Sequence, residues 1–175
     1  MENTAYILLG GNQGNREKLL EQAIQLIKTN IGQIIKCSGL YESDAWGFKS
    51  ESKFLNQVIQ ITTVFSPNQL LSELKKIESQ LGRTRTEEKG YEDRSLDLDI
   101  LFYNELIINK RELIIPHPRM HLRRFTLKPL AEIAGSVIHP HFKVSVENLL
   151  NNCNDQVEVY DYFPQVNQEY SGDEI

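Results

Sequence analysis

The sequence predicts an α+β fold in which strands and helices follow one another in the order β-α-β-β-α-β. Short runs rich in β-branched residues are separated by two segments whose apolar residues recur at helical spacing. The chain has 175 residues, of which 40% are hydrophobic and 25% are charged, and this length and composition suit one domain with a core. We expect residues 1–164 to form this single domain and residues 165–175 to form a disordered acidic tail.

A glycine-rich turn joins the first predicted strand to the first predicted helix. Tyr6–Leu9 is a short β run, and Arg16–Thr29 carries apolar residues at helical spacing behind an asparagine N-cap, Asn12 or Asn15. The turn itself, Gly10–Asn15, matches neither the ending of a P-loop nor the Gly-x-Gly-x-x-Gly fingerprint. Two interpretations remain open for this turn: a tight turn that needs positive φ, or a mobile loop near a substrate.

Two more strands follow, and a polar loop separates them. Ile34–Tyr41 and Phe54–Val64 are rich in β-branched and other apolar residues, which predicts strands. The loop between them, Glu42–Lys53, holds the only tryptophan, Trp46. This ring is equally suited to anchoring the loop on the core and to stacking on a flat ligand. Asn56 is similarly open between capping the loop and recognising the edge of a heterocycle.

The second helix and a further strand complete the unit. Ser66 and Pro67 predict a helix start, Gly82 predicts its end, and the apolar residues between them form one stripe. A charged loop, Arg83–Asp93, leads to a strand that spans about Leu96 to Phe102. The resulting β-α-β-β-α-β order is that of the ferredoxin-like split unit.

The sequence predicts smaller elements after this unit. A short strand is expected at Leu106–Ile108, and short helices are expected between Pro116 and Leu150. A late strand is expected within Gln156–Phe163. The complete prediction is therefore a ferredoxin-like sandwich with additional short helices and strands in its C-terminal part.

Composition argues against several classes of protein. The net charge of −5 argues against non-specific binding of nucleic acid. Cys37 and Cys153 have no cysteine or histidine at metal-ligand spacing, so we expect two reduced thiols and a cytoplasmic protein. The N-terminus has no basic region and no apolar stretch approaches about 18 residues, which argues against secretion and membrane insertion. Between Lys110 and Lys128, six Lys or Arg and one acid suit a small anionic ligand.

The last strand of the unit carries two carboxylates on one face. Asp97 and Asp99 are two positions apart, which places their Cβ atoms about 6.5 to 7 Å from each other. The apolar residues expected on the opposite, core-facing side are Leu96, Leu98, Ile100 and Phe102.

This pair of aspartates follows three arginines, Arg83, Arg85 and Arg94. Two neighbouring anions repel each other and Asp is depleted in strands, so the arrangement costs stability unless cations neutralise it. Carboxylate oxygens are the ligands that Mg²⁺ prefers, and the pattern indicates a metal clamp for phosphate. The alternative is a strand whose solvent face happens to carry two aspartates.

The histidines give weaker indications. His117 lies between two prolines and is followed by three arginines, which is unusual for a core histidine, although its residue type alone favours a structural or surface role. His121, His139 and His141 have no acid or cysteine partner at a useful spacing, so we expect them to be structural.

Several segments between about Ala5 and Ala134 together resemble one enzyme family in their order and spacing. They are Gly10-Gly11-Asn12, Phe54-Leu55-Asn56, Ile77-Glu78 with Gly82-Arg83-x-Arg85, Arg94 to Leu101, Pro116 to Met120, Arg123-Arg124-Phe125 and Pro129 to Ala134. The family is 6-hydroxymethyl-7,8-dihydropterin pyrophosphokinase, an enzyme of folate synthesis. The resemblance implies a ferredoxin-like fold and transfer of the β,γ-diphosphate of ATP to the pterin hydroxymethyl group, with release of AMP.

The resemblance also implies roles for individual residues. Asp97 and Asp99 would bind two Mg²⁺ ions that bridge the ATP phosphates, and Arg83 and Arg94 would approach the transferred group. The residues implied for the nucleotide are Ile100, His117, Pro118 and Arg123, with Arg85, Lys75 and Glu78 as further candidates. The residues implied for the pterin are Ser43, Asp44, Trp46, Phe54, Asn56 and Phe125.

Two other functions are compatible with an aspartate pair on such a sheet. A metal-dependent nucleotidyltransferase or nuclease would bind nucleic acid, which the acidic net charge disfavours. A non-catalytic ferredoxin-like ligand-binding module would leave both aspartates facing solvent. The favoured interpretation has ATP and hydroxymethyldihydropterin as small-molecule partners, no nucleic acid or membrane partner, and a monomeric chain.

Overall fold

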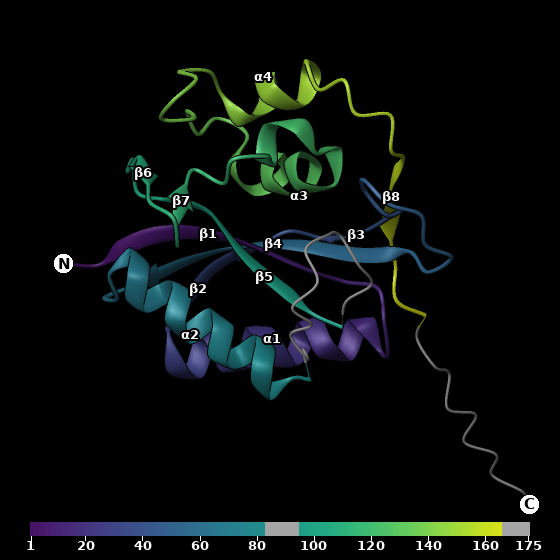
Figure 1. Cartoon of the computed structure of the whole chain (residues 1–175), viewed down its shortest axis with the longest axis horizontal. Helices are drawn as coiled ribbons and strands as arrows, with labels where there is room; N and C mark the ends of the chain where they lie inside the picture. Colours follow the sequence, from purple (N-terminus) through teal and green to yellow (C-terminus); the bar gives the residue numbers. More distant parts are fainter. Residues whose placement is uncertain (83–94, 166–175) are drawn as a thin grey trace, which may run out of the picture.

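The computed structural model describes residues 1–82 and 95–165. A mixed-length antiparallel sheet runs through the middle of the molecule, with helices on both faces (Figure 1). Its strands follow the order β5-β1-β4-β3-β8, and β2 pairs with β4 beside this path. The strands are β1 (Asn3–Gly11), β2 (Gly32–Cys37), β3 (Leu40–Ser43), β4 (Phe54–Thr63), β5 (Asp97–Tyr103) and β8 (Val159–Tyr162). A separate two-stranded hairpin consists of β6 (Ile108–Asn109) and β7 (Ile114–Ile115).

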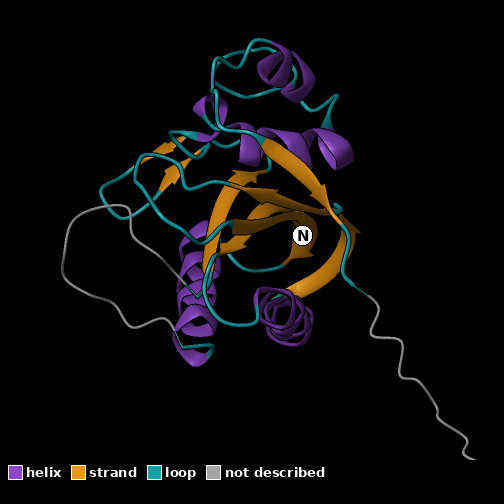
Figure 2. Cartoon of the chain, turned by 90° about the vertical axis from the view of Figure 1, so that its right-hand side faces the viewer, coloured by secondary structure: helices purple, strands orange, loops and turns teal. Residues whose placement is uncertain are grey.

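Helices cover the sheet as two layers, which Figure 1 shows below and above it and Figure 2 shows from the side. One layer holds α1 (Arg16–Asn30) and α2 (Pro67–Gln80). The other holds α3 (Arg124–Ala134), α4 (Val146–Asn151) and the short 3₁₀ helix η1 (Met120–Leu122). None of the helices within the described ranges is long and apolar enough to cross a membrane.

The helix starts follow the expected capping chemistry. The Asn15 side chain accepts a hydrogen bond from the backbone N–H of Lys18, so Asn15 rather than Asn12 is the N-cap of α1. Ser66 and Gln69 form a reciprocal capping box at the start of α2, with Pro67 at the first helical position. Local sequence therefore fixes both helices of the unit.

The core has two parts because β1 is buried on both of its faces. Ile7 and Leu9 pack with α1 and α2, whereas Tyr6 and Leu8 pack with α3 and α4. A strand between two helical layers needs apolar residues at successive positions. This requirement explains the continuous apolar run that ends at Gly10.

The predicted orientation of Phe102 is wrong. Leu96, Leu98 and Ile100 face α1 and α2 as expected, but Phe102 is buried in the other part of the core. The pairing of β1 with β5 shifts register between Tyr6 and Ile7, because Ile7 faces Ile100 whereas Tyr6 faces Phe102. This bulge inserts one residue and reverses the side-chain alternation beyond it.

The predicted strand Ile34–Tyr41 is split into β2 and β3. At the break, the Ser38 side chain accepts a hydrogen bond from the N–H of Val58 (2.9 Å). The N–H of Gly39 donates to the carboxylate of Glu132 on α3, which also accepts from the Tyr41 hydroxyl (2.6 Å). Burial, followed by the interactions with Glu132, raises the pKa of Tyr41. Contacts with distant residues thus stabilise an interruption that local propensity does not predict.

Further elements agree in part with the sequence prediction. The strand expected at Leu106–Ile108 is shifted to Ile108–Asn109, and its partner β7 was not predicted. The strand expected within Gln156–Phe163 is β8. Most of the expected tail, residues 166–175, lies outside the described residues.

Three histidines surround Phe142 beside the second part of the core. His139 is buried, and its Nδ1 accepts hydrogen bonds from the N–H groups of His141 and Phe142 (3.2 Å each). Its ring contacts Phe102 and Phe142. Burial, followed by repulsion from His121 and His141, lowers the pKa of His139 to about 4. The structural role expected for His139 is confirmed.

The pKa of His139 predicts a pH-dependent stability. The unfolded chain takes up a proton near pH 6.5, whereas the folded protein resists protonation down to about pH 4. The contribution of His139 is therefore complete above pH 6.5 and is lost as the pH falls toward 4. Chemical denaturation as a function of pH should show this loss in the wild-type protein. His139→Asn keeps an acceptor without titrating and should reduce the slope of the profile without abolishing it, because the pKa of His117 is also lowered to about 4, whereas the same substitution at exposed His141 should leave the slope unchanged.

An equal slope for the His139→Asn variant and the wild-type protein between pH 4 and 6.5 would contradict this assignment.

Candidate active site

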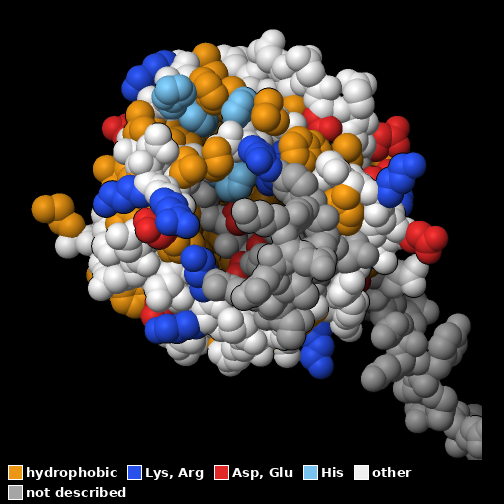
Figure 3. All heavy atoms as spheres, viewed as in Figure 1, with side chains coloured by type: hydrophobic (Ala, Val, Ile, Leu, Met, Phe, Trp, Pro, Cys, Tyr) orange, Lys and Arg blue, Asp and Glu red, His pale blue; other side chains and the backbone are white. Residues whose placement is uncertain are grey.

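The two aspartates of β5 lie beside the glycine end of β1. Asp97 pairs with Gly10 and Asp99 pairs with Leu8 in the antiparallel register, and both aspartates are half-buried. Because Leu98 between them faces α1 and α2, the aspartates lie on the face that carries η1 and α3. Figure 3 has the same view as Figure 1, and acidic side chains lie near its centre with histidine and Lys or Arg side chains around them.

Glu78 of α2 fixes the peptide between these aspartates. Its side chain is 4% exposed, and Oε1 accepts a hydrogen bond from the N–H of Leu98 (2.8 Å). β5 lies at one end of the described strand order, so this N–H points away from β1 and needs a partner outside the sheet. A buried carboxylate is costly unless it is hydrogen-bonded, and this bond satisfies both groups. Glu78 therefore fixes the position of the β5 backbone between Asp97 and Asp99.

His117 lies near Asp97 and is held by its backbone surroundings. Its N–H donates to the carbonyl of Leu101 (3.0 Å), and its Nδ1 accepts from the N–H of Arg119 (3.1 Å). Burial, followed by the cation of Arg123, lowers the pKa of His117 to about 4, although Asp97 opposes this shift. The imidazole is neutral at pH 7, and the bond at Nδ1 assigns its proton to Nε2. His117 can therefore donate a hydrogen bond without adding a second cation.

Arg123 joins two of the aromatic candidates. Its guanidinium lies 4.6 Å from the centre of the Trp46 ring and 5.7 Å from that of Phe125. The side chain is buried at the start of α3, where desolvation strengthens the attraction between a cation and an aromatic face. The Trp46 ring therefore contacts a cation at the start of α3, and this contact connects its loop to that helix.

Trp46, Arg123 and Phe125 form one wall of the candidate site. Asn56 and Ser43 form a second wall, which is buried. The Asn56 amide nitrogen donates to Ser43 Oγ (3.0 Å) and to the carbonyl of Tyr41 (3.3 Å). A Cβ at Gly10 would lie 3.3 Å from Asn56 Oδ1, so a glycine at this position leaves room for the amide. Both donors of Asn56 are used within the fold, and recognition of a ligand would fall to its Oδ1 atom. Phe54 lies beside this wall in a T-shaped contact with Phe48.

The loop that carries Trp46 is tied at both ends to the first strand and helix. The buried side chain of Asn12 donates to the carbonyl of Ser52 (3.2 Å). Arg16 donates to the carbonyl of Lys53 (2.8 Å) and forms an ion pair with Glu42 (2.8 Å). The glycine-rich segment before α1 thus orders the loop of residues 44–53. Of the two interpretations left open for that segment, a tight turn that needs positive φ is supported, because Gly14 has a φ of 69°.

The structure brings some of the sequence-predicted residues together and leaves others apart. Asp97, His117 and Arg123 interact electrostatically, and Trp46, Arg123 and Phe125 form one contact group. The side chain of Ile100 is buried in the core toward α1 and α2, so only its backbone can face a ligand at the aspartates. Asp44, Lys75 and Pro118 are exposed. Arg83, Arg85 and Arg94 lie outside the described residues.

Sequence reasoning missed three contacts that support the site. The bond from Glu78 to Leu98 could not be read from the sequence, because 20 positions separate the two residues. Asn12 was considered only as an N-cap, whereas its buried side chain donates to the carbonyl of Ser52. Asp155, which contacts the start of α3, gave no signal because its partner Arg124 lies 31 positions away.

Comparisons with known proteins show the family to which the chain is similar. Residues 6–135 match the family described as 7,8-dihydro-6-hydroxymethylpterin-pyrophosphokinase (HPPK). The 2-amino-4-hydroxy-6-hydroxymethyldihydropteridine pyrophosphokinase of Bacillus subtilis is 44% identical over 138 residues, covering 78% of this chain and 81% of that protein. The protein of the same name from Aquifex aeolicus is 39% identical over 140 residues, covering 80% and 86%.

Longer proteins contain a similar segment. The folic acid synthesis protein fol1 of Pneumocystis carinii is 43% identical over 150 residues, which are 86% of this chain but 20% of that protein. The crystal structure of wild-type Plasmodium falciparum HPPK-DHPS superposes with a TM-score of 0.70 at 19% identity, covering 86% of this chain and 44% of that chain. The chain thus spans 20% of the Pneumocystis carinii protein and 44% of the Plasmodium falciparum chain. The structural likeness shows the ferredoxin-like fold.

The bond from Glu78 to Leu98 predicts a difference between two variants. Glu78→Leu leaves the buried N–H of Leu98 without its acceptor, which should lower the free energy of unfolding by about 1 to 3 kcal/mol. Glu78→Gln keeps an oxygen acceptor of similar size and should lower it less. Urea denaturation measures both values, and Gln80→Leu, at an exposed position of the same helix, is the control. Equal losses for the Leu and Gln variants would show that the acceptor is not what stabilises this contact.

Proposed function

The chain belongs to the 7,8-dihydro-6-hydroxymethylpterin-pyrophosphokinase family, and we propose that the residues around Asp97, Asp99 and Arg123 carry out its reaction. The reaction is the ATP-dependent transfer of a diphosphate to hydroxymethyldihydropterin in folate synthesis. The observation that carries the assignment to these residues is the fixed pair of aspartates. Glu78 holds the peptide between them, and neutral His117 and cationic Arg123 face the same region.

The proposed metal ligands are Asp97 and Asp99, which would hold two Mg²⁺ ions. Within residues 1–82 and 95–165 no group of three or more His, Cys, Asp or Glu could hold a metal ion. Two carboxylates nevertheless suit Mg²⁺, which usually takes one or two protein carboxylates and completes its shell with water and substrate phosphates. Bound there, Mg²⁺ would neutralise charge on the phosphate oxygens during transfer. The residues present therefore fit this metal.

Two groups near Asp97, Arg123 and His117, have complementary proposed roles on the nucleotide. Arg123 offers a permanent cation, and His117 offers a neutral Nε2–H donor that adds no further charge. Such preorganised donors stabilise charge that develops on phosphate oxygens, because they need no reorganisation during the reaction. The arginines proposed for the transferred group are Arg83 and Arg94, and the other residues proposed for the nucleotide are Ile100, Pro118, Arg85, Lys75 and Glu78.

The proposed pterin site lies between the two walls described above. Trp46 and Phe125 offer ring faces beside Arg123, and Asn56 offers its Oδ1 to the edge of the heterocycle. The remaining residues proposed for the pterin are Ser43, Asp44 and Phe54. We propose that residues 1–164 act as a single domain and that a monomer is sufficient.

The identity of the nucleotide product tests the proposed function. Attack of the pterin oxygen on the β-phosphorus of ATP releases AMP, whereas attack on the γ-phosphorus would release ADP. Incubation with ATP, Mg²⁺ and 6-hydroxymethyl-7,8-dihydropterin should therefore yield AMP and a pterin diphosphate in equal amounts, as measured by anion-exchange chromatography. Neither product should form when pterin or divalent metal is omitted. ADP as the main product, or ATP turnover that does not depend on pterin, would contradict the proposal.

Substitution of the aspartates tests the proposed metal site. Asp97→Asn and Asp99→Asn keep the size of the side chain but remove a charge, so kcat should fall by several orders of magnitude. Without metal the variants should be no less stable than the wild-type protein, because repulsion between the two carboxylates is relieved. Glu105→Gln, at an exposed position after β5, is the control. Near-normal kcat in both aspartate variants at saturating ATP would rule out the proposed role.

A further inference from the structure

Residues 153–162 lie beyond the family match, which ends at residue 135, yet they contact both walls of the proposed pterin site. In Figure 1 the chain leaves α4 above the sheet and descends to β8 at the sheet edge. Along this path it contacts first the start of α3 and then β3. The segment therefore connects two elements that each carry proposed pterin contacts.

The first connection is at the N-terminus of α3. The N-cap residue Arg123 makes no side-chain capping bond. Instead, Asp155 Oδ2 accepts from the backbone N–H of Arg124 (2.9 Å), and Asp155 Oδ1 accepts from the N–H of Val157 (3.1 Å). Asp155 thus satisfies the first orphan N–H of the helix and places a negative charge at its positive end.

Arg124 strengthens this connection from the opposite direction. Its guanidinium donates to the carbonyl of Cys153 (2.8 Å) and to the carbonyl of Asp155 (3.2 Å). Together with the backbone bond to the carboxylate, three hydrogen bonds join Arg124 to residues 153–155. The two neighbours of Arg124 are Arg123 and Phe125. These three hydrogen bonds therefore hold the backbone between the two residues at the start of α3 that are proposed to contact substrates.

The second connection is at β3. β8 pairs with β3 in antiparallel fashion, and Val159 lies opposite Ser43, which binds Asn56. Lys128 of α3 donates to the carbonyl of Val159 (3.0 Å). The segment between Asp155 and Val159 therefore spans from the start of α3 to the wall formed by Ser43 and Asn56.

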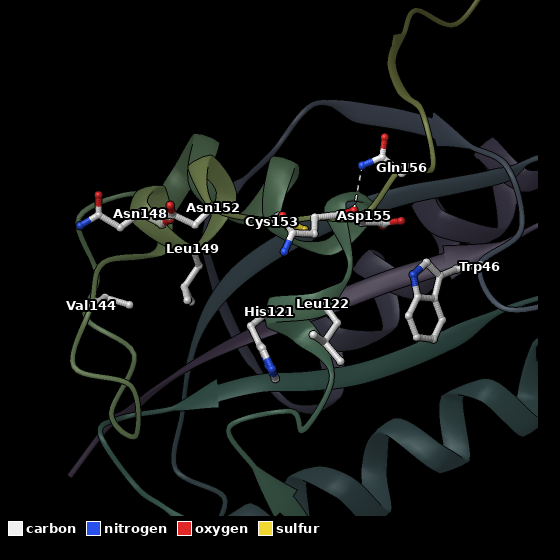
Figure 4. Close-up of a pocket in the computed structure, with 11 residues that line it drawn as sticks. Trp46, His121, Leu122, Val144, Asn148, Leu149, Asn152, Cys153, Asp155 and Gln156 are labelled. Carbon is white, nitrogen blue, oxygen red and sulfur yellow. Dashed lines mark hydrogen bonds between the residues drawn. The ribbon is translucent and has the colours of Figure 1, made fainter.

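A hollow separates this segment from Trp46. It has a volume of about 820 Å³, and its lining includes Trp46, Leu122, Cys153, Asp155 and Gln156. Figure 4 shows Trp46 on one side of the hollow and Asp155 and Gln156 on another. Arg124 and Arg123 connect Asp155 to the indole ring, because Arg124 is bonded to Asp155 and the guanidinium of its neighbour Arg123 lies over that ring.

We propose that Asp155 is a positioning residue for pterin binding, which acts by capping α3 and so holding Arg123 over the rings of Trp46 and Phe125. The nature of the ligand rests on the proposed function above, whereas the effect on Trp46 does not. An uncapped helix N-terminus loses order in its first turn. Arg123 and Phe125 would then lose the orientation in which the cation lies over the rings.

Two readouts without turnover test this proposal. Trp46 is the only tryptophan, so its emission spectrum in the substrate-free protein reports the contact with Arg123. Asp155→Ala should shift this emission and should weaken the binding of 6-hydroxymethylpterin about tenfold, as measured by calorimetric titration. Asp155→Asn keeps one acceptor and should have a smaller effect on both. In turnover, KM for the pterin should rise in the Ala variant while kcat at saturation changes little.

Asp161→Ala is the matched control, because Asp161 is an exposed aspartate of β8 in the same segment. Its emission and pterin affinity should equal those of the wild-type protein. If the Asp155→Ala variant matches this control in both readouts, the proposal is overturned.

If Asp155→Ala does not fold, Asp155→Asn decides the matter. It keeps one oxygen acceptor for the N–H groups of Arg124 and Val157 but removes the negative charge at the start of α3. A shift of emission and a loss of pterin affinity support the proposal, and wild-type values overturn it. If the wild-type protein forms no AMP, the proposed function is refuted. The role of Asp155 in positioning Arg123 is still tested, because the emission of Trp46 in the Asp155→Ala and Asp161→Ala variants is compared without substrate.

Discussion

The candidate site depends on how the N–H of Leu98 is satisfied. β5 is the last strand of the described order on its side, so this group has no strand to pair with, and Glu78 of α2 supplies the acceptor. The bond fixes the peptide between Asp97 and Asp99 to a helix that is itself packed on the core. An edge position, which usually leaves a strand free to move, here becomes a rigid support for two carboxylates.

The use of Glu78 as this acceptor adds a third carboxylate to the region of Asp97 and Asp99. Glu78 is buried, and Asp97 and Asp99 are half-buried on the strand that it holds. Three carboxylates so close together oppose folding unless cations or hydrogen bonds balance them. In the described protein the N–H of Leu98 supplies Glu78 with a hydrogen bond, and Asp97 interacts electrostatically with His117. The proposed divalent ions would balance more of this charge, so the same charges that cost stability would give the site its affinity for metal and phosphate.

The sequence predicted the features that depend on neighbours in the chain and missed those that depend on distant partners. The caps at Asn15 and Ser66 and the β-α-β-β-α-β order were confirmed, because capping and periodicity are local. The break before β3 was missed because Glu132 stabilises it from 93 positions away. The bulge that reverses Phe102 was missed because register between strands is set by pairing. In the candidate site, residue types indicated the aspartate pair, whereas its support by Glu78 required the fold.

The walls proposed to hold the pterin show why a short motif is not enough to build such a site. Asn12 from the N-terminal part orders the loop of Trp46 from one side. Asp155 from the C-terminal part caps the helix that begins beside Arg123 on the other side. These bonds lie on either side of the cation that contacts the indole and Phe125 rings, and the proposal above gives them a part in holding it there. Because a side chain can be oriented only as precisely as its backbone, we expect residues beyond the matched segment to contribute to this geometry together with the residues within it.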